Sequence, residues 1–287
     1  MNNKNENLDD FYEELNNRLK VDCSKCFGLC CIALFFSKSE GFPQDKEAGK
    51  PCINLQENFS CCVHDKLKEK GLKGCMTYEC FGAGQQTAQQ TYQGKSWREA
   101  GVSAEEMFDV FVQMRNIYEM IWYLSEAYRL EKNNAYKKEI KEIIQETLKL
   151  TELAGDKLVK LDLIPYRMKI NKTLFKTSEE VRQRYIKIKK GKLKCKRFIA
   201  GRPNFIGEDL KNRDLRGENL SSALLIAADL RNMDLSGVDF LGTDLRDADL
   251  RGSNLTNTIY LTQFQLNAAK GDKSTKIPPS LKYPSNW

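Results

Sequence analysis

The chain has 287 residues, of which 41% are apolar and 30% are charged, and its formal net charge is +7. This is an ordinary globular composition, and the length suits one large domain or two to three small ones. No stretch approaches the roughly 18 to 20 consecutive apolar residues of a membrane helix, and the polar N-terminus carries no secretion signal, so we expect a cytoplasmic protein with no membrane span.

The N-terminal part combines a short helix with a cysteine-rich region. Apolar residues at helical spacing predict an amphipathic helix over residues 8–20. Nine of the ten cysteines then lie between Cys23 and Cys80, and only Cys195 stands apart. In a reducing compartment such clustering favours metal ligation, with disulfides as the alternative. The region is rich in glycine and proline and cannot build a large apolar core, so we expect cross-links or metal to hold its shape.

Thiolates and an imidazole at short spacing are the donors that zinc or iron requires. The run CSKCFGLCC places two sulfurs on one tight turn, where both can reach a single ion, and CCVH adds a thiolate–imidazole pair. Residues 20–84 resemble a family named for its CxxCxxxCC motif and described as a zinc- or iron-chelating domain. The resemblance implies four ligands: Cys23, Cys26, Cys30 and Cys31. The further candidates are Cys52, Cys61, His64, Cys75 and Cys80.

This donor set exceeds one four-coordinate site. Two zinc ions, one multinuclear cluster, or one iron–sulfur cluster with spare cysteines all fit the sequence. The choice between Cys61 and Cys62 as a ligand is open. His64 is the only histidine, so if it binds metal no His-based nucleophile activation remains. Walker A and G-x-G-x-x-G motifs are also absent, and an enzyme would therefore have to work through the metal.

The middle of the chain is predicted to be helical. A polar stretch, QQTAQQTYQGKSWRE, precedes a capping box at Ser103 and Glu106, which opens a helix reaching Tyr128. After a break at residues 133–134, a second helix covers residues 136–148, and Gly155 is expected to end it. The short connection predicts an antiparallel hairpin, and a third helix is expected over residues 178–189.

A basic segment leads into the C-terminal part. It contains Arg182, Arg184, Lys187, Lys189, Lys190, Lys192, Lys194, Lys196, Arg197 and Arg202. Nucleic acid is a conceivable partner for residues 182–202, but no binding motif surrounds them. We favour a solvated connector.

Large apolar residues recur every five positions from Phe205 to Leu255 without a gap, and the residue before each is usually Asp or Asn. Neither the strand period nor the helix period explains this, so the pattern indicates a repeat architecture. The motif A(D/N)Lxx resembles the pentapeptide-repeat family. The resemblance implies a right-handed, four-sided β-helix with twenty residues per turn, and with a small inward residue two positions before each leucine. Glu208, Arg213 and Glu218 depart from that rule, and we expect them to lean out to solvent.

The repeat is short and only mildly acidic. Eleven pentapeptides make just under three turns, roughly 14 Å of solenoid at about 4.8 Å per turn. Residues 204–272 hold 11 acidic and 7 basic residues, a net charge of −4. Some members of the family are long acidic rods that imitate DNA and bind type II topoisomerases. This chain fits that pattern poorly. The segment YLTQFQLNAAKGD is expected to cap the C-terminal end, and the basic segment with the helical region the other end.

Together these observations predict a multidomain protein. We expect a helix and cysteine-rich metal-binding module over residues 1–85, a helical region with a basic connector over residues 86–200, and the capped solenoid over residues 201–287. The expected function is a cytoplasmic, metal-binding scaffold or adaptor for a protein partner, with zinc or iron as cofactor and no catalytic residues assigned. The alternatives are a zinc- or iron–sulfur-dependent enzyme that modifies a protein or peptide, and a DNA mimic that binds topoisomerases.

Overall fold

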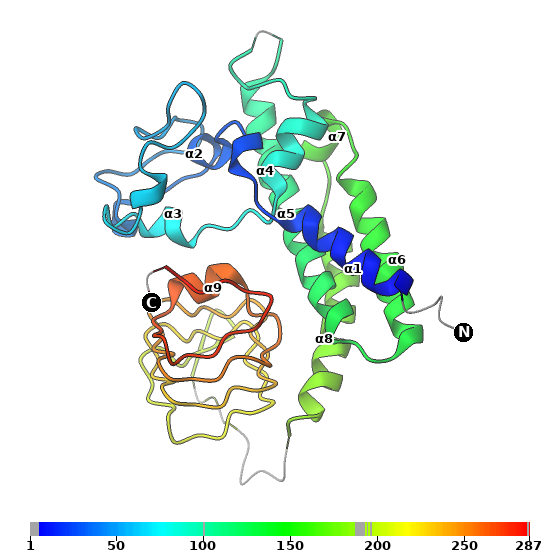
Figure 1. Ribbon diagram of the computed structural model, residues 1–287, viewed down its shortest axis with the longest axis vertical. Helices are drawn as coiled ribbons and strands as arrows, with labels where there is room; N and C mark the ends of the chain where they lie inside the picture. The colour runs from blue at the N-terminus through cyan, green and yellow to red at the C-terminus, as the bar shows by residue number, and fades with distance from the viewer. Residues whose placement is uncertain (1–5, 100, 187–192, 194, 196, 286) are drawn as a thin grey trace. The chain divides into compact units, whose positions relative to one another are not determined.

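A computed structural model describes residues 6–99, 101–186, 193, 195, 197–285 and 287. The chain divides into two compact units. Unit 1 comprises Met1–Gly74 and Cys80–Leu174, and unit 2 comprises Cys75–Glu79 and Phe175–Trp287. Figure 1 shows helices and irregular loops in unit 1 and a stack of coils in unit 2. Unit 1 thus contains most of the cysteine-rich region and most of the helical region.

The central element of unit 1 is α5 (Ala104–Leu130), which begins at the predicted cap because the Ser103 hydroxyl accepts a hydrogen bond from the Glu106 amide at 3.3 Å. Helices α1 (Glu6–Leu19), α2 (Leu29–Ala33) and α4 (Ala83–Gln86) all contact it. So do α6 (Asn134–Leu150) and α7 (Gly155–Val159). Because neighbours surround it, α5 buries side chains on most of its circumference. As the first helix of the hairpin, α5 therefore connects the cysteine-rich region to α6 and α7.

Short helices occupy the cysteine-rich region: η1 (Cys23–Lys25), η2 (Lys38–Glu40), η3 (His64–Lys66) and α3 (Lys73–Thr77).

The second helix of the hairpin ends earlier than its sequence suggests. Asn133 caps α6, as its side chain accepts hydrogen bonds from the amides of Ala135 and Tyr136. The helix ends at Leu150, and Gly155 begins α7 instead of ending α6, so the expected stop at Gly155 was wrong. The residues between the two helices form a turn in which Leu153 donates to the Leu150 carbonyl at 3.4 Å.

The polar stretch after Cys80 is helical and partly buried. It forms α4 and then a π-helix, η4 (Thr87–Thr91), in which Thr87 and Ala88 are fully buried. Its glutamines bind distant backbone groups. Gln85 accepts from the Asp22 amide at 2.7 Å, and Gln89 donates to the Lys25 carbonyl at 2.9 Å. This stretch fastens the first cysteine turn to the helices.

The third helix, α8 (Ile164–Gln183), begins 14 residues before the predicted start at Ser178 and ends at Gln183. Pro165 occupies its first turn, where the missing N–H costs nothing. A buried stripe at helical spacing holds the helix in place, and it consists of Ile170, Leu174, Thr177, Ser178 and Val181. Residues 187–189, where the helix was also expected, lie outside the described residues. The helix starts in unit 1 and, from Phe175 onwards, belongs to unit 2.

The repeat region forms stacked coils. Residues pair in parallel with those 20 positions later, as in Asp209 with Asp229 and Asn219 with Asp239. Successive pairs are five residues apart, so each coil has four sides. Each side is so short that it contributes isolated bridges, and the one regular strand pair among the described residues is the hairpin of β1 (Phe198–Ile199) and β2 (Arg202–Pro203).

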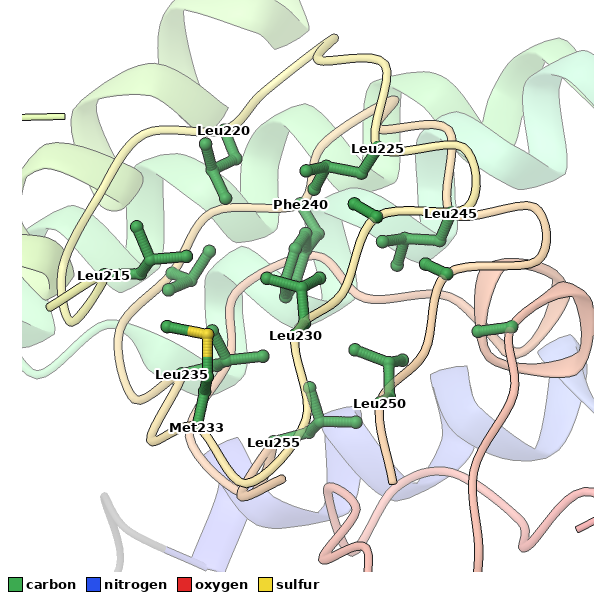
Figure 2. Packing of buried hydrophobic residues seen from close by; sticks show 14 of the residues in the cluster. Leu215, Leu220, Leu225, Leu230, Met233, Leu235, Phe240, Leu245, Leu250 and Leu255 are labelled. Atoms are coloured by element: carbon green, nitrogen blue, oxygen red, sulfur yellow. The ribbon is translucent and has the colours of Figure 1, made fainter. Parts of the chain in front are cut away.

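The five-residue period arises from the solenoid core. Figure 2 shows the leucines and Phe240 directed into the interior of the coils. Leu215, Leu225, Leu230, Leu235 and Phe240 are fully buried. The smaller residues two positions before them, such as Ala223 and Ala248, are also buried and leave room for the large ones. The interior is therefore a packed core without a channel.

Both ends of the core are covered. Leu193 and Cys195 pack against it at one end, in the part of the basic segment that the structure describes. At the other end lies α9 (Gln263–Ala268), where the Gln265 amide donates to the carbonyls of Phe240 and Thr243. This segment is the cap that the sequence predicts.

The coils continue beyond the last regular pentapeptide, because Lys270 pairs with Asp249 and Lys276 with Asn254. The solenoid is thus longer than the repeat count suggests. Three residues of the first coil depart from the rule of a small residue two positions before each leucine. Of these, Arg213 is exposed, as expected. Glu208 and Glu218 are half-buried at the surface, and Glu208 pairs with Arg197 at 2.8 Å.

None of the described helices has the length and apolar character needed to cross a membrane.

Candidate functional site

The first group of thiols surrounds the turn between η1 and α2. Cys26 is buried, and its pKa is raised to about 12, first by burial and then by repulsion from Cys80, Cys23 and Cys31. A side chain at Gly84 would meet its sulfur, since a Cβ there would lie 2.3 Å from Cys26 Sγ. The closeness of α4 to η1 therefore brings Cys80, more than fifty residues away in sequence, to the C-x2-C turn.

Cys30 and Cys31 are adjacent on α2 and share a hydrogen bond. The Cys30 thiol donates to Cys31, which raises the pKa of Cys30, and its burial raises it further. The same bond lowers the pKa of Cys31, with help from the positive charge of Lys46. Lys46 is itself buried, and its ammonium donates to the Ile32 carbonyl at 2.8 Å and to the Leu34 carbonyl.

A second group lies beside Cys31. The Cys52 amide donates to the Cys31 carbonyl at 2.9 Å, and Cys61 pairs with Leu55 in an antiparallel bridge. Burial raises the pKa of Cys61, as does repulsion from Cys31, Cys52 and Cys62. Cys52 also lines a cavity of about 360 Å³ in the loop over residues 42–53. The fold thus links Cys31, Cys52 and Cys61 through neighbouring backbone segments.

Three other candidate metal ligands have different surroundings. His64 is 63% exposed, and its nearest charged partner is Asp65 at 3.5 Å. Cys62 is exposed, with its sulfur directed toward Asn54 at 3.9 Å. Cys75 belongs to the segment Cys75–Glu79 of unit 2, where Asn267 donates to the neighbouring Met76 carbonyl at 3.0 Å.

An aromatic cluster supports the cysteine-rich region. The Trp97 indole donates to the Phe27 carbonyl at 2.9 Å, next to the first cysteine turn. The Arg98 guanidinium lies over the rings of Phe59 and Trp97 at 4.5 and 4.6 Å and donates to the Glu57 carbonyl at 2.6 Å. These contacts fix the loop that carries Cys61.

The fit of this region to a metal is chemical more than geometric. All ten cysteines are free thiols. Across the part of the chain that the structure describes, no group of three or more His, Cys, Asp or Glu side chains is gathered closely enough to hold a metal ion. The residue types nevertheless suit zinc or iron, because thiolates are ligands of both metals and thiols from separate segments interact electrostatically around Cys26 and Cys31. The thiols whose charges interact within these two groups are Cys23, Cys26, Cys30, Cys31, Cys52, Cys61 and Cys80, and among the described residues they are not gathered into a metal site.

The solenoid surface explains the Asp or Asn before each leucine. The side-chain oxygen accepts a hydrogen bond from the amide two residues later, as in Asp229 to Arg231 at 3.2 Å and Asn219 to Ser221 at 2.9 Å. This bond closes the turn at each corner. Leu224 stands where the acid is expected and has no side-chain oxygen to close its corner, but its amide donates to the Pro203 carbonyl at 2.8 Å as the Asp229 amide does to Glu208 at 2.9 Å.

Arginines neutralise much of the acidic surface. Arg231 binds Asp229 through both Nε and Nη2, and Arg251 binds Asp249 in the same way. Lys211 reaches the next coil, at 3.0 Å from Asp229. The Arg231 guanidinium holds the pKa of Asp229 well below its usual range. Such pairing leaves little free negative charge on this side and gives the DNA-mimic alternative no support.

Sequence reasoning missed a second surface, where the end of α8 lies on the solenoid. The Ser178 hydroxyl donates to Asp239 Oδ2 at 2.5 Å, and both residues are buried. The Arg182 guanidinium donates to the Gly217 carbonyl at 3.1 Å. Tyr185 packs on Gly237, where a Cβ would come within 2.4 Å of its ring. We call Gly217, Gly237 and Asp239 the Asp239 face.

The sequence marks the corners of the coils but does not single out the Asp239 face. The corner position two residues after each leucine often has a left-handed backbone, with φ values of +66° at Gly217 and +71° at Gly237. Ser222, Ala227, Asn232 and Asp247 adopt the same conformation, so side chains are tolerated at this position. The close approach of α8 excludes a side chain at 217 and 237, but glycine at this position does not by itself mark the covered corner, because Gly207, Gly242 and Gly252 lack α8 among their nearest neighbours.

The basic segment is only partly described. Lys187, Lys189, Lys190, Lys192, Lys194 and Lys196 lie outside the described residues. Arg197 pairs with Glu208, and Arg202 donates to the carbonyls of Ser222 and Gly242 at 2.7 and 3.2 Å. Among the described arginines, Arg182, Arg197 and Arg202 thus have partners on the solenoid. This accords with a connector that covers the first coil.

Comparison with known proteins identifies two relationships. The family model for pentapeptide repeats matches residues 204–242 and 219–257, with eight copies. An uncharacterized protein of Bacillus subtilis (strain 168), YybG, is 46% identical over 278 residues, which cover 96% of this chain and 97% of the relative. No solved structure matches the chain. The repeats are consistent with a role in protein interaction.

Proposed function

This chain belongs to the same family as Bacillus subtilis YybG, and from its structure we propose that it is a protein-interaction scaffold whose solenoid binds other proteins. One observation carries the proposal: the solenoid already holds a protein segment, the end of α8, on one of its sides. Its interior is filled by leucine and phenylalanine side chains, so ligands can bind only to its outer surface.

The cysteine-rich region has a supporting role in this proposal. We infer that its thiols bind zinc or iron, and that the metal holds a glycine- and proline-rich segment in shape in the cytoplasm. The mutual repulsion that, after burial, raises the pKa values of Cys26 and Cys61 supports this inference, since it shows thiols of separate segments acting on one another. Metal would supply cross-links where the apolar core is thin. A metal-dependent enzyme that modifies a protein or peptide is the alternative.

Position-specific photo-crosslinking in the native host tests the scaffold. A photoreactive residue is placed at Arg213 or Asp247, which are exposed on the solenoid, and as a matched control at Lys138, which is exposed on α6. A scaffold predicts discrete adducts from the solenoid positions that are absent from the α6 position. Equal labelling from all positions, or no adduct from either solenoid position, would overturn the proposal.

Anaerobic purification of untagged protein, followed by elemental analysis and an absorption spectrum, tests the metal. Zinc gives a colourless protein, whereas an iron–sulfur cluster absorbs in the visible range. A folded protein with neither element would refute metal binding. A coloured, iron-containing protein would favour the enzyme alternative.

A further inference from the structure

The Asp239 face is shaped to receive a helix. Two stacked glycines, Gly217 and Gly237, form its floor, and Asp239 lies beside them as the polar group. A Cβ at Gly217 would come within 2.8 Å of the Arg182 carbonyl oxygen, so the helix backbone itself rests on this floor. At Gly207 the same corner position is open, since nothing lies within 4 Å of a Cβ there, and at Gly252 a Cβ would meet the Asn232 side chain and not a helix. The face is therefore specialised within the repeat.

The end of α8 offers no charged partner to Asp239, the polar group of the face. Asp239 is fully buried, and its carboxylate accepts hydrogen bonds from Ser178 Oγ and from the Leu241 amide at 2.8 Å. Among the described residues, no Lys or Arg forms an ion pair with Asp239. The nearby Arg182 instead pairs with Glu179 at 2.7 Å. A buried carboxylate bound only by neutral donors lacks the partner that would stabilise it most.

A second mismatch lies one residue before Ser178. Thr177 is fully buried, and its hydroxyl has no hydrogen-bond partner among the described residues. A buried hydroxyl without a partner lowers the stability of the docked helix. The end of α8 thus packs closely on the glycines of the Asp239 face, but its polar groups form few favourable contacts there. This is expected for a segment that another helix can displace.

We propose that the Asp239 face is the site at which the solenoid binds its partner, that the end of α8 covers it in the resting protein, and that the partner supplies an amphipathic helix with a Lys or Arg directed at Asp239. This inference rests on the proposed scaffold function and names its surface. The cation replaces the Ser178 hydroxyl, and the small residues of the floor admit the partner's backbone.

Two labelled peptides test the proposal by fluorescence anisotropy with the full-length protein. One has the sequence of residues 172–186, and the other carries Ser178→Lys. Because a charged hydrogen bond exceeds a neutral one, the lysine peptide is expected to bind at least about tenfold more tightly. In the Asp239→Asn protein this preference disappears. In Asp229→Asn, which alters an ion-paired carboxylate on another side, the preference is kept.

A variant that weakens the contact between α8 and the Asp239 face tests whether the peptides compete with α8 for this face. Tyr185→Ala in the protein removes the ring that packs on Gly237, so both peptides are expected to bind about tenfold more tightly than to wild type. Hydrogen exchange of the wild-type protein gives the same information without a variant, because the amides of residues 178–185 should lose protection when the lysine peptide is added.

Three outcomes would overturn the inference: no binding by either peptide, a lysine preference that persists in Asp239→Asn, or unchanged protection of residues 178–185 at saturating peptide. Each is distinguishable from failure of the scaffold function. If the solenoid positions still give discrete photo-adducts while the peptides do not bind, the scaffold stands and its binding surface lies elsewhere.

Discussion

Ser178 and Asp239 form a buried hydrogen bond of 2.5 Å that joins the end of α8 to the solenoid. Asp239 occupies the position at which other coils expose Asp or Asn to solvent, as at Asn219. The repeat supplies this carboxylate to close a corner turn, and here the same group also receives a helix. One side chain thus serves both the local fold and the attachment of a neighbouring element.

Asp239 should give unit 2 an unusual pH dependence. Burial raises its pKa, although the hydrogen bond from Ser178, the Leu241 amide and the charge of Arg182 oppose the shift. Because the folded-state pKa lies above the unfolded one, the stability that this group contributes is fully present below the unfolded pKa and is lost as pH rises through the folded pKa. Asp239→Asn should therefore raise stability at neutral pH, by about 1 kcal/mol, and should give no such gain in acid.

Chemical denaturation of both proteins from pH 4 to pH 8 measures this effect. Asp229→Asn is the matched control and should show no pH dependence in this range, because Arg231 lowers the pKa of Asp229, which stays ionised from pH 4 to pH 8. The stability from Asp229 is present above its unfolded pKa and is lost as pH falls through the folded pKa. A stability difference between wild type and Asp239→Asn that does not change with pH would contradict the buried-carboxylate account.

Gly237→Ala should loosen the end of α8. The added Cβ would lie 2.4 Å from the Tyr185 ring, and overpacking of this kind costs about 1 to 3 kcal/mol. Gly207→Ala is the control, because Gly207 has a similar φ of +66° and open space around it. Both variants carry the same backbone strain, so the difference between their unfolding free energies isolates the contact with Tyr185. Equal losses would show that backbone conformation, and not α8, requires glycine at 237.

Leu230→Ala should destabilise the solenoid by about 2 to 5 kcal/mol, because it empties a fully buried core position. Hydrogen exchange over residues 225–255 should report the loss, since each coil shares its backbone hydrogen bonds with the next. Ile206→Ala removes a side chain that is 40% exposed, and a change within about 0.5 kcal/mol is expected. Similar effects of the two substitutions would be incompatible with a packed interior.

Cys26→Ser should reduce the metal content of purified protein and increase proteolysis within residues 20–84, because Cys26 is the buried thiol that neighbours Cys23, Cys31 and Cys80. Cys62→Ser is the matched control, as its thiol is exposed and directed toward Asn54. Elemental analysis and limited trypsin digestion measure the two effects. Metal content that is equal in both variants and in wild type would remove Cys26 from the ligand set.

The solenoid is readable along the chain alone, because its five-residue period is produced within the repeat. Each leucine fills the core and each Asp or Asn closes its own corner, so these interactions are readable along a single stretch of chain. The caps at Ser103 and Asn133 were likewise readable, since a capping side chain acts on amides within three residues. The cysteine cluster was evident from spacing, and the metal that it is proposed to hold stays a prediction.

The contacts between distant residues became evident only in the folded chain. Folding brought Cys80 to the first cysteine turn through α4 and left His64 exposed. It also extended α8 back to Ile164 and laid its end on Gly217 and Gly237. Such contacts depend on the packing of whole helices and coils, whose energies are sums over residues far apart in the chain. The role of Asp239 could therefore not be separated, in sequence, from that of every other acid in the repeat.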